Sequence, residues 1–161
     1  MDANLKTYFE KHNIEYKIHA HPAVFTVAEH SKLIGKMPNI LHTKTLFLKD
    51  DGNNFYLVGM YAHKRLDLKV LKEKLNAKKK LSFASPEQLK EKLNLTPGSV
   101  SIFGMIYAKP NSVFLIIDKQ VWDAPLVGFH PNINTSTLEL SHEALEKFYL
   151  SLYAKKQILQ L

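Results

Sequence analysis

The chain of 161 residues, with 45% hydrophobic and 23% charged residues, has the size and composition of a globular protein, which excludes a disordered polymer. It contains no cysteine, which excludes a disulfide framework, a thiolate zinc site and a cysteine nucleophile. No apolar run reaches the roughly 18 to 20 residues that span a bilayer, and residues 1–6 lack the pattern of a signal peptide. We therefore expect one domain over residues 1–161, located in the cytoplasm and without a membrane partner.

The formal net charge of +7 is unevenly distributed along the chain. Between Lys64 and Lys92 there are ten basic residues and four acidic ones, so most of the excess lies in this segment. Such a surface attracts polyanions, although an ordinary solvated helical face has the same composition. Arg65 is the only arginine, which favours lysine contacts with phosphates over bidentate reading of bases.

The first part of the chain predicts two helices and a strand. The apolar positions of residues 4–12 lie on one helical face, and residues 15–19 alternate like a strand. Thr26 and Glu29 have the spacing of a capping box, in which the hydroxyl accepts from the backbone N–H three residues later. A second helix is therefore expected to begin here and to end at Gly35.

Two apolar segments, residues 40–48 and 55–60, flank a turn rich in Asp, Gly and Asn. This pattern predicts a β-hairpin. Lys44 lies among the leucines and the phenylalanine of the first segment. Its side chain either reaches solvent at a strand edge or enters a partly dry pocket, where it would be a functional candidate.

The segment after the hairpin predicts two capped helices and a loop. Asp67 can cap a helix that continues to about Leu75. Ser85-Pro86-Glu87-Gln88 combines a capping box with proline at the first helical position. Residues 96–104 form a glycine-bearing turn with exposed backbone N–H groups, which is either a cradle for a carbonyl or phosphate or an ordinary loop.

The remaining elements complete the expected fold. Residues 113–117 predict a central strand, residues 135–140 alternate as another strand, and Ser141 caps a last helix. Strands and short helices alternate without a βαβ period or a G-x-G-x-x-G motif. The fold class expected is mixed α/β, with a twisted, partly barrel-like mixed β-sheet flanked by helices.

Residues 126–138 combine turn-forming residues, a histidine and small hydroxyls between two apolar runs, as the wall of a site would. Gly128 permits close approach of the backbone, and Pro131 favours an extended conformation of His130 at the mouth of a strand. A loop histidine is either a solvated side chain or a ligand-binding or catalytic group, and both interpretations stay open at this point.

A metal site built on the other histidines is not expected. His19 and His21 could be combined with His30 or His42, but the chain has no HExxH motif and no histidine pair at i, i+4. We therefore expect no metal and no cofactor.

Three motifs follow one another along the chain: Thr43-Lys44-Thr45-Leu46-Phe47-Leu48, Thr96-Pro97-Gly98-Ser99-Val100, and the stretch from Gly128-Phe129-His130-Pro131-Asn132 to Leu138. Their order and spacing resemble the YbaK/prolyl-tRNA synthetase-associated editing domain family, closest to its ProX-type branch. Together with His21-Pro22, Phe25-Thr26, Lys64–Leu68, Leu81–Ala84 and the final helix, the likeness covers about Leu5 to Leu150.

The resemblance implies a twisted mixed β-barrel flanked by helices, and hydrolysis of the ester that joins a wrongly attached amino acid, alanine in this branch, to tRNA(Pro). It implies that Lys44 is catalytic. It implies that the substrate is bound by Thr45, Gly98, Ser99, Gly128, Phe129 and His130. The basic segment between Lys64 and Lys92 suits an acceptor stem, and we expect Lys72, Lys78, Lys79 and Lys80 to bind the tRNA through its phosphates. The expected partners are the acceptor end of mischarged tRNA(Pro) and prolyl-tRNA synthetase, and no DNA.

The mechanism we expect uses water as the nucleophile. Lys44 binds the terminal adenosine phosphate or the developing negative charge, while Gly98 and neighbouring N–H groups hold the carbonyl. Since these residues include no evident general base, a hydroxyl of the substrate ribose would orient or activate the water. Thr45 stands where this branch usually has Asn, and Ile102 where the loop often has Pro, so both bear on substrate preference.

Two other functions fit the same sequence. One is a non-catalytic module that binds aminoacyl-tRNA or a synthetase through the basic segment between Lys64 and Lys92. The other is a small α/β protein that binds a different anionic metabolite and does not depend on tRNA.

Overall fold

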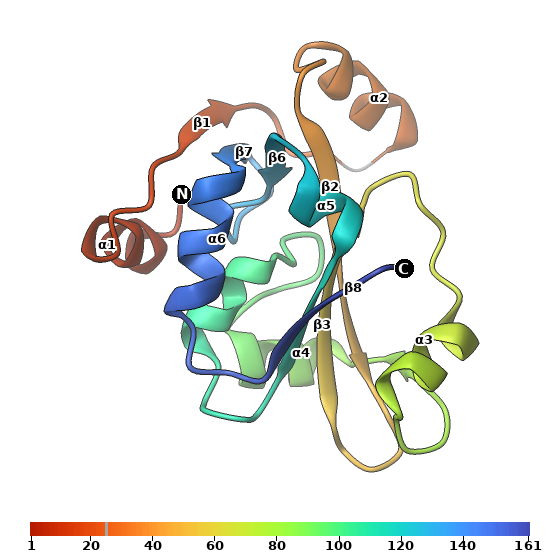
Figure 1. Ribbon diagram of the computed structural model, residues 1–161. Helices are drawn as coiled ribbons and strands as arrows, with labels where there is room; N and C mark the ends of the chain where they lie inside the picture. The colour runs from red at the N-terminus through yellow and green to blue at the C-terminus, as the bar shows by residue number, and fades with distance from the viewer. Residues whose placement is uncertain (25) are drawn as a thin grey trace.

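An eight-stranded mixed sheet forms the centre of the protein (Figure 1). The computed structural model describes residues 1–24 and 26–161; Phe25, part of the family likeness, lies outside the described residues. The order is β1-β7-β6-β2-β3-β5-β8, and β4 pairs with β2. The strands are β1 (Lys17–Ala20), β2 (Leu41–Lys49), β3 (Phe55–Tyr61), β4 (Ser82–Phe83), β5 (Phe114–Asp118), β6 (Leu126–Phe129), β7 (Ser136–Ser141) and β8 (Lys156–Leu159).

Short helices surround the sheet, and α2 and α3 lie near opposite ends of β2 (Figure 1). The helices are α1 (Ala3–Lys11), α2 (Val27–Gly35), α3 (Leu68–Leu75), α4 (Pro86–Leu93), the 3₁₀ helix η1 (Ile102–Tyr107), α5 (Lys119–Asp123) and α6 (His142–Ser151). None of the helices in the described part of the chain is both long and apolar enough to cross a membrane.

The sheet separates two hydrophobic clusters. Successive residues of a strand point to opposite faces, and the long hairpin follows this rule: Phe47 and Leu57 belong to the larger cluster, Leu48 and Val58 to the smaller. In the larger cluster the ring of Phe103 contacts those of Phe9, Phe129 and Phe148, with centroids 5.2, 5.5 and 5.0 Å away. The smaller cluster lies beneath α3 and includes Leu71 and Ile116.

The predicted helix starts are confirmed by their caps. The hydroxyl of Thr26 accepts from the backbone N–H of Glu29 at 3.1 Å, and the carboxylate of Asp67 accepts from the N–H of Lys69 at 2.9 Å. Ser85 and Gln88 form both bonds of a capping box. The hairpin is confirmed as well, since β2 and β3 pair in antiparallel register from Thr43 to Lys49.

Two expectations about the chain's second half need correction, and one of its helices was not predicted. The strand expected at the centre of the sheet, β5, lies next to its edge, because β8 pairs with it in parallel. The loop expected over residues 96–104 ends at Ser101, whose hydroxyl caps η1 by accepting from the N–H of Phe103. Helix α5 was not expected. These elements are short, and β8 is held by backbone pairing rather than by an alternating apolar pattern.

Candidate active site

The candidate site lies along the side of β2 that faces away from β3, between the segments of β2 that pair with β6 and with β4. On that side β2 pairs with β6 at Leu41 and His42 and with β4 at Leu48 and Lys49. Within the described ranges, residues 43–46 have no paired strand there, so the sheet is open at this point. A side chain closes part of the gap, because the Thr43 hydroxyl donates to the carbonyl oxygen of Gly128 at 2.7 Å.

A cavity of about 280 Å³ occupies this opening, and we call it the outer cavity. Four residues singled out in the sequence line it: Lys44, Thr45, Gly98 and His130. The other lining residues are His30, Thr43, Ala62 and Val100. The three family motifs, far apart in the chain, therefore contribute to one site. Ser99 lines neither this cavity nor the one next to it.

Lys44 is half-buried in β2, opposite Met60 of β3. No hydrogen bond or ion pair between residues of the described ranges engages its ammonium group. The ammonium is therefore available to an anionic group in the outer cavity. The side chain of Lys44 was expected either to reach solvent at a strand edge or to enter a pocket, and its position supports the pocket.

The loop of Gly98 faces the same cavity. Gly98 has φ +88°, a left-handed conformation that favours glycine. A Cβ atom placed on Gly98 would lie 3.8 Å from the side-chain amide nitrogen of Asn134. The loop thus packs beside the stretch that follows β6. Ile102 does not line the outer cavity: it is fully buried, and a Cβ on Gly59 would approach its side chain to 2.8 Å.

A smaller cavity of about 80 Å³, the inner cavity, adjoins the outer one. The two share His30, Thr43 and His130. The other walls of the inner cavity are Val24, Leu33, His42, Gly128, Phe129 and Thr137. Gly128 is needed at its position, because a Cβ there would lie 2.9 Å from Ile40 and 3.1 Å from Thr137.

Neutral imidazoles form much of the inner wall. Nδ1 of His130 bonds to the Ser136 carbonyl at 3.3 Å, and Nε2 of His42 bonds to the Met37 carbonyl at 3.3 Å. A carbonyl only accepts, so these nitrogens carry protons, and in the neutral ring the other nitrogen carries none. Burial lowers the pKa of both histidines, despite the opposing effect of the carbonyls.

Two further features of the site concern its charge. In the part of the chain that the structure describes, no carboxylate lines either cavity. The same residues include no group of three or more His, Cys, Asp or Glu side chains arranged to hold a metal ion. The charged group of the site is thus the ammonium of Lys44.

Some residues of the site were not predicted to belong to it. His30, Thr43 and Val100 line the outer cavity without having been assigned to it. Thr43 and Val100 belong to two of the family motifs, and this is the signal that could have identified them. His30 reaches the site because α2 packs over the end of the sheet, which no local pattern encodes.

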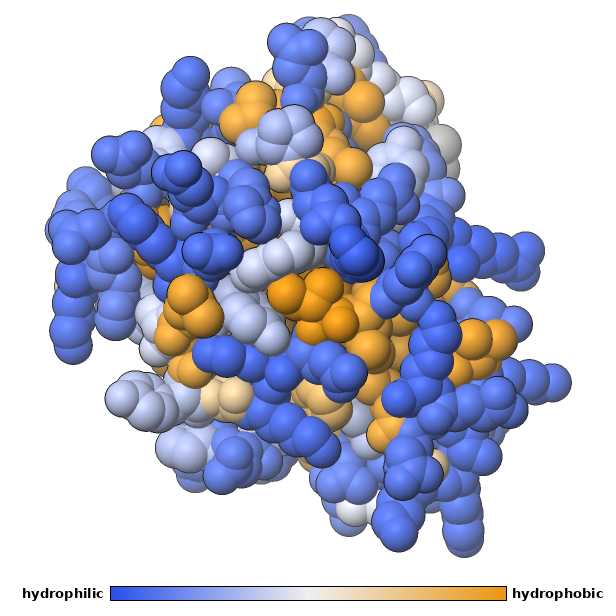
Figure 2. Space-filling model, in the orientation of Figure 1, coloured by the Kyte–Doolittle hydropathy of each residue, from blue (hydrophilic) through white to orange (hydrophobic). Residues whose placement is uncertain are grey.

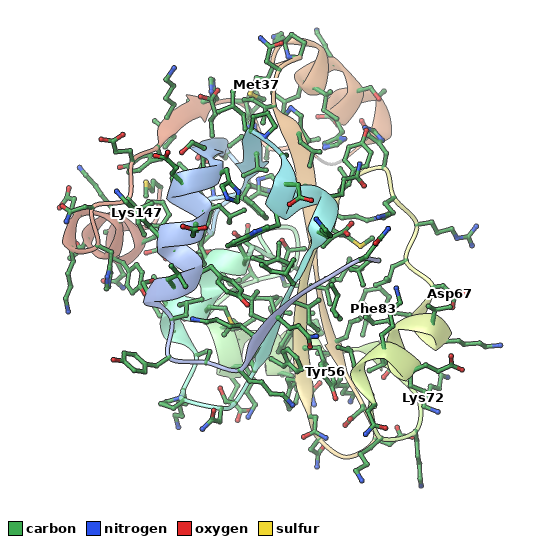
Figure 3. The ribbon with its side chains drawn as sticks, in the orientation of Figure 1. Met37, Tyr56, Asp67, Lys72, Phe83 and Lys147 are labelled. Carbon is green, nitrogen blue, oxygen red and sulfur yellow. The ribbon has the colours of Figure 1, made fainter. Side chains whose placement is uncertain are left out.

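The lysines predicted to bind tRNA lie at the other end of β2. Lys72, Lys79 and Lys80 line a groove whose apolar part includes Leu68 and Leu81. Figure 2 shows hydrophilic side chains around hydrophobic surface in this region. Met37, beside α2, and Lys72, on α3, mark the two ends of the molecule (Figure 3).

The turn that carries Lys78 and Lys79 is fixed by Asp50. The carboxylate of Asp50 accepts from the backbone N–H of Lys78 at 3.0 Å and from the hydroxyl of Tyr56 at 3.1 Å. It also accepts from the backbone N–H groups of Gly52 and Asn54. Lys79 has φ 57°, which is uncommon for a residue with a side chain. The lysine turn is therefore a defined structure, attached to the tip of the β2–β3 hairpin.

Comparison with known proteins gives a consistent result. The model of the family described as aminoacyl-tRNA editing domain matches residues 21–148. The chain is 38% identical over 136 residues to the prolyl-tRNA editing protein ProX of Acetoanaerobium sticklandii, a match that covers 83% of this chain and 81% of the relative. It is 30% identical over 151 residues to prolyl-tRNA synthetase associated domain-containing protein 1 of Danio rerio, covering 89% and 78%.

The fold agrees with these matches. The crystal structure of a candidate trans-editing enzyme for prolyl-tRNA synthetase superposes with a TM-score of 0.74 at 17% identity, covering all of this chain and 98% of the other. At this identity the likeness concerns the fold. Because the family model spans most of the chain and includes all three motifs of the site, the protein belongs to the aminoacyl-tRNA editing domain family and is an aminoacyl-tRNA deacylase.

Proposed function

We propose that the protein is a trans-editing enzyme that removes alanine from mischarged tRNA(Pro). The observation that carries this proposal is the pair of adjoining cavities, one lined by Lys44 and Gly98 and the other small and enclosed by His130, Gly128 and Phe129. Relatives named for prolyl-tRNA editing and for association with prolyl-tRNA synthetase support the choice of tRNA. The whole chain, residues 1–161, acts as one editing domain in the cytoplasm.

The outer cavity binds the terminal adenosine and the ester. Lys44 neutralises the adenosine phosphate or the negative charge that develops on the carbonyl oxygen. The backbone N–H groups of the Gly98 loop hold that oxygen, and water attacks the carbonyl carbon. A preorganised donor of this kind stabilises a transition state by about 3 kcal/mol. This division of roles uses two of the three family motifs that face the cavity, those of Lys44 and Gly98.

The inner cavity sets the size of the amino acid. Its volume of about 80 Å³ is less than a third of that of the outer cavity. In this proposal a methyl side chain enters that space, and the walls formed by His130 and Phe129 exclude the ring of proline. Steric exclusion of a larger group can be strong, while one added methylene favours a larger group by only about 1 to 3 kcal/mol. The correct product, prolyl-tRNA(Pro), is thereby spared.

The groove lined by Lys72, Lys79 and Lys80, together with Lys78 of the lysine turn, binds the acceptor stem. Asp50, which anchors the lysine turn, follows Lys44 by six residues along β2, or roughly 20 Å at about 3.3 Å per residue. Phosphates of the stem, rather than those of the terminal nucleotide, lie at such a distance from the ester. Lys72, Lys78, Lys79 and Lys80 provide positive charge without base-specific geometry, which suits backbone contacts. The enzyme acts beside prolyl-tRNA synthetase, which supplies the mischarged tRNA.

The test is direct. The protein is incubated with tRNA(Pro) charged with alanine, cysteine, serine or proline, and deacylation of each is followed over time. Rapid loss of alanine with retention of proline is the expected result. Binding of all four without hydrolysis would instead identify a non-catalytic module, and no binding of tRNA would favour another anionic ligand.

A further inference from the structure

His30 lies at the junction of the two cavities. It belongs to α2, where its backbone N–H donates to the carbonyl oxygen of Thr26 at 3.0 Å. Its side chain lines both the outer and the inner cavity, as do Thr43 and His130. An aminoacyl ester that extends from the outer cavity into the inner one therefore passes beside the imidazole of His30.

The ring of His30 is available to water or substrate. The rings of His21, His42 and His130 are bonded to Thr137, Met37 and Ser136 respectively. No hydrogen bond between residues of the described ranges uses a ring nitrogen of His30. The ring is half-buried, so a proton that it accepts can still reach solvent.

The other two imidazoles are less suited to transfer a proton. His42 is 6% exposed and lines the inner cavity alone, away from Lys44 and Gly98. His130 is held by its bond to the Ser136 carbonyl as part of the wall. No carboxylate within the described ranges lines either cavity, so the residues of the site offer no acidic side chain for this role.

We propose that His30, in place of the ribose hydroxyl expected from the sequence, is the general base of the deacylation, an inference that rests on the proposed function. Its unprotonated ring nitrogen accepts a proton from water while the water oxygen bonds to the ester carbonyl carbon. The bond between that carbon and the ribose oxygen then breaks, and the imidazolium returns the proton to the ribose oxygen. The products are the free amino acid, whose acid group ionises in water, and tRNA with an intact terminal ribose.

The surroundings of His30 favour its neutral, proton-accepting form. Burial lowers its pKa below the usual 6.5, and His63, whose ring centroid lies 6.2 Å away just after β3, lowers it further. The ring of His42 on β2 also lies nearby, with its centroid 6.4 Å away, and His130 and Lys44 line the outer cavity together with His30. On α2 itself, Glu29 and Lys32 line a different groove.

Three variants, and His130→Gln for comparison, test the proposal in the full chain with alanyl-tRNA(Pro). His30→Ala removes the base, His30→Gln keeps a polar side chain without a basic nitrogen, and His63→Gln is the matched control that lines neither cavity. The kcat of each is measured from about pH 5 to about pH 8, a range that covers the titration of histidine. Circular dichroism and the midpoint of thermal unfolding verify the fold.

The kcat of the natural protein is expected to rise with pH below 6.5 and then to become constant, because only neutral His30 accepts the proton. We call this rise the acidic limb of the pH profile. His30→Ala and His30→Gln lower kcat by about 100-fold or more and lose this limb. Added imidazole partly restores the His30→Ala rate. His63→Gln remains active, but its limb moves to higher pH, because the charge that opposed protonation of His30 is gone.

Several outcomes overturn the proposal. A full rate in His30→Gln would exclude a base at this position, as would an unchanged pH profile in His30→Ala. If the limb disappears in His130→Gln and persists in His30→Gln, the base is His130. If the natural protein hydrolyses none of the four aminoacyl-tRNAs, the proposed function fails and the role of His30 fails with it; if it is active and the His30 profiles do not change, only the present inference fails.

Discussion

The hydroxyl of Thr43 donates to the carbonyl oxygen of Gly128 at 2.7 Å, and this bond joins β2 to β6 just beyond their last backbone pair. It connects the strand that carries Lys44 to the strand that leads to His130. The two halves of the candidate site are therefore held together by secondary structure and one side-chain bond. The Lys44 side chain itself has no part in this connection, and this separation allows its function to be tested apart from its effect on the fold.

Lys44→Ala is expected to abolish deacylation and to leave the fold intact. The ammonium makes no hydrogen bond or ion pair within the described residues, so its removal breaks none. Loss of one charge-stabilising donor corresponds to about 100- to 1,000-fold in kcat. Initial rates and thermal midpoints are compared with those of Lys49→Ala, which removes another lysine from β2. Parental activity in Lys44→Ala would refute the catalytic assignment.

Replacement of Lys72, Lys78, Lys79 and Lys80 by alanine is expected to weaken tRNA binding for all sequences alike. Each lost phosphate contact reduces the slope of log affinity against log salt by about 0.7 to 0.9, so four contacts account for about 3. Binding is measured at a series of salt concentrations, and the change per charge is compared with that of a Lys6, Lys11 and Lys109 variant. If the salt slope changes equally per charge in the two variants, the four lysines are ordinary solvated surface and not a tRNA-binding site.

His130→Ala is expected to relax size selection. Removal of the ring enlarges the inner cavity, so activity on prolyl- or seryl-tRNA(Pro) should increase relative to activity on alanyl-tRNA(Pro). His142→Ala serves as the control, because its Nδ1 also bonds to a backbone carbonyl, that of Trp122, away from both cavities. A uniform loss on all substrates would mean that His130 orients the ester or supports the fold instead.

Asp50→Asn is expected to destabilise the protein by about 2 kcal/mol at neutral pH. Burial opposes ionisation of Asp50, but the N–H groups of Asn54 and Lys78, the Asn54 amide and the Tyr56 hydroxyl together lower its pKa from 3.8 to about 2. The folded-state pKa lies below the unfolded value, so the stabilisation is complete above 3.8 and is lost as the pH falls towards 2.

Urea unfolding at about pH 7 and about pH 3 measures this contribution, since the difference between the natural protein and the variant should shrink at the lower pH. Asp123→Asn is the control, because its ion pair with Lys119 is exposed and such pairs contribute little. An equal difference at both pH values would exclude the carboxylate charge as the source of the stabilisation.

The fold was predictable from the sequence wherever a signal is local. The caps at Thr26, Asp67 and Ser85 act over three residues, and the structure has all of them. The strand β8 escaped prediction because pairing with β5, some forty residues earlier in the chain, creates it. Edge strands with half-exposed side chains carry little periodicity.

The candidate site was predictable in part. Lys44 was conspicuous as a charge in an apolar strand, and the family likeness placed Gly98 and His130 with it. Their meeting depends on the parallel pairing of β2 with β6 across more than eighty residues, which periodicity does not reveal. His30 was considered only as a metal ligand, because its place beside the cavities follows from the packing of α2 over the sheet.

The close packing of Ile102 against Gly59 lowers the entropy that the neighbouring loop loses when substrate binds. The loop of residues 96–101 runs between Leu95 and Ile102, both of which are buried, so its two ends are fixed even though Gly98 is exposed. Ordering a residue costs about 1 to 2 kcal/mol, and for this loop much of that cost is met when the chain folds. A methyl group at position 59 would displace Ile102 and loosen the loop, slowing the reaction through a residue that never meets the substrate.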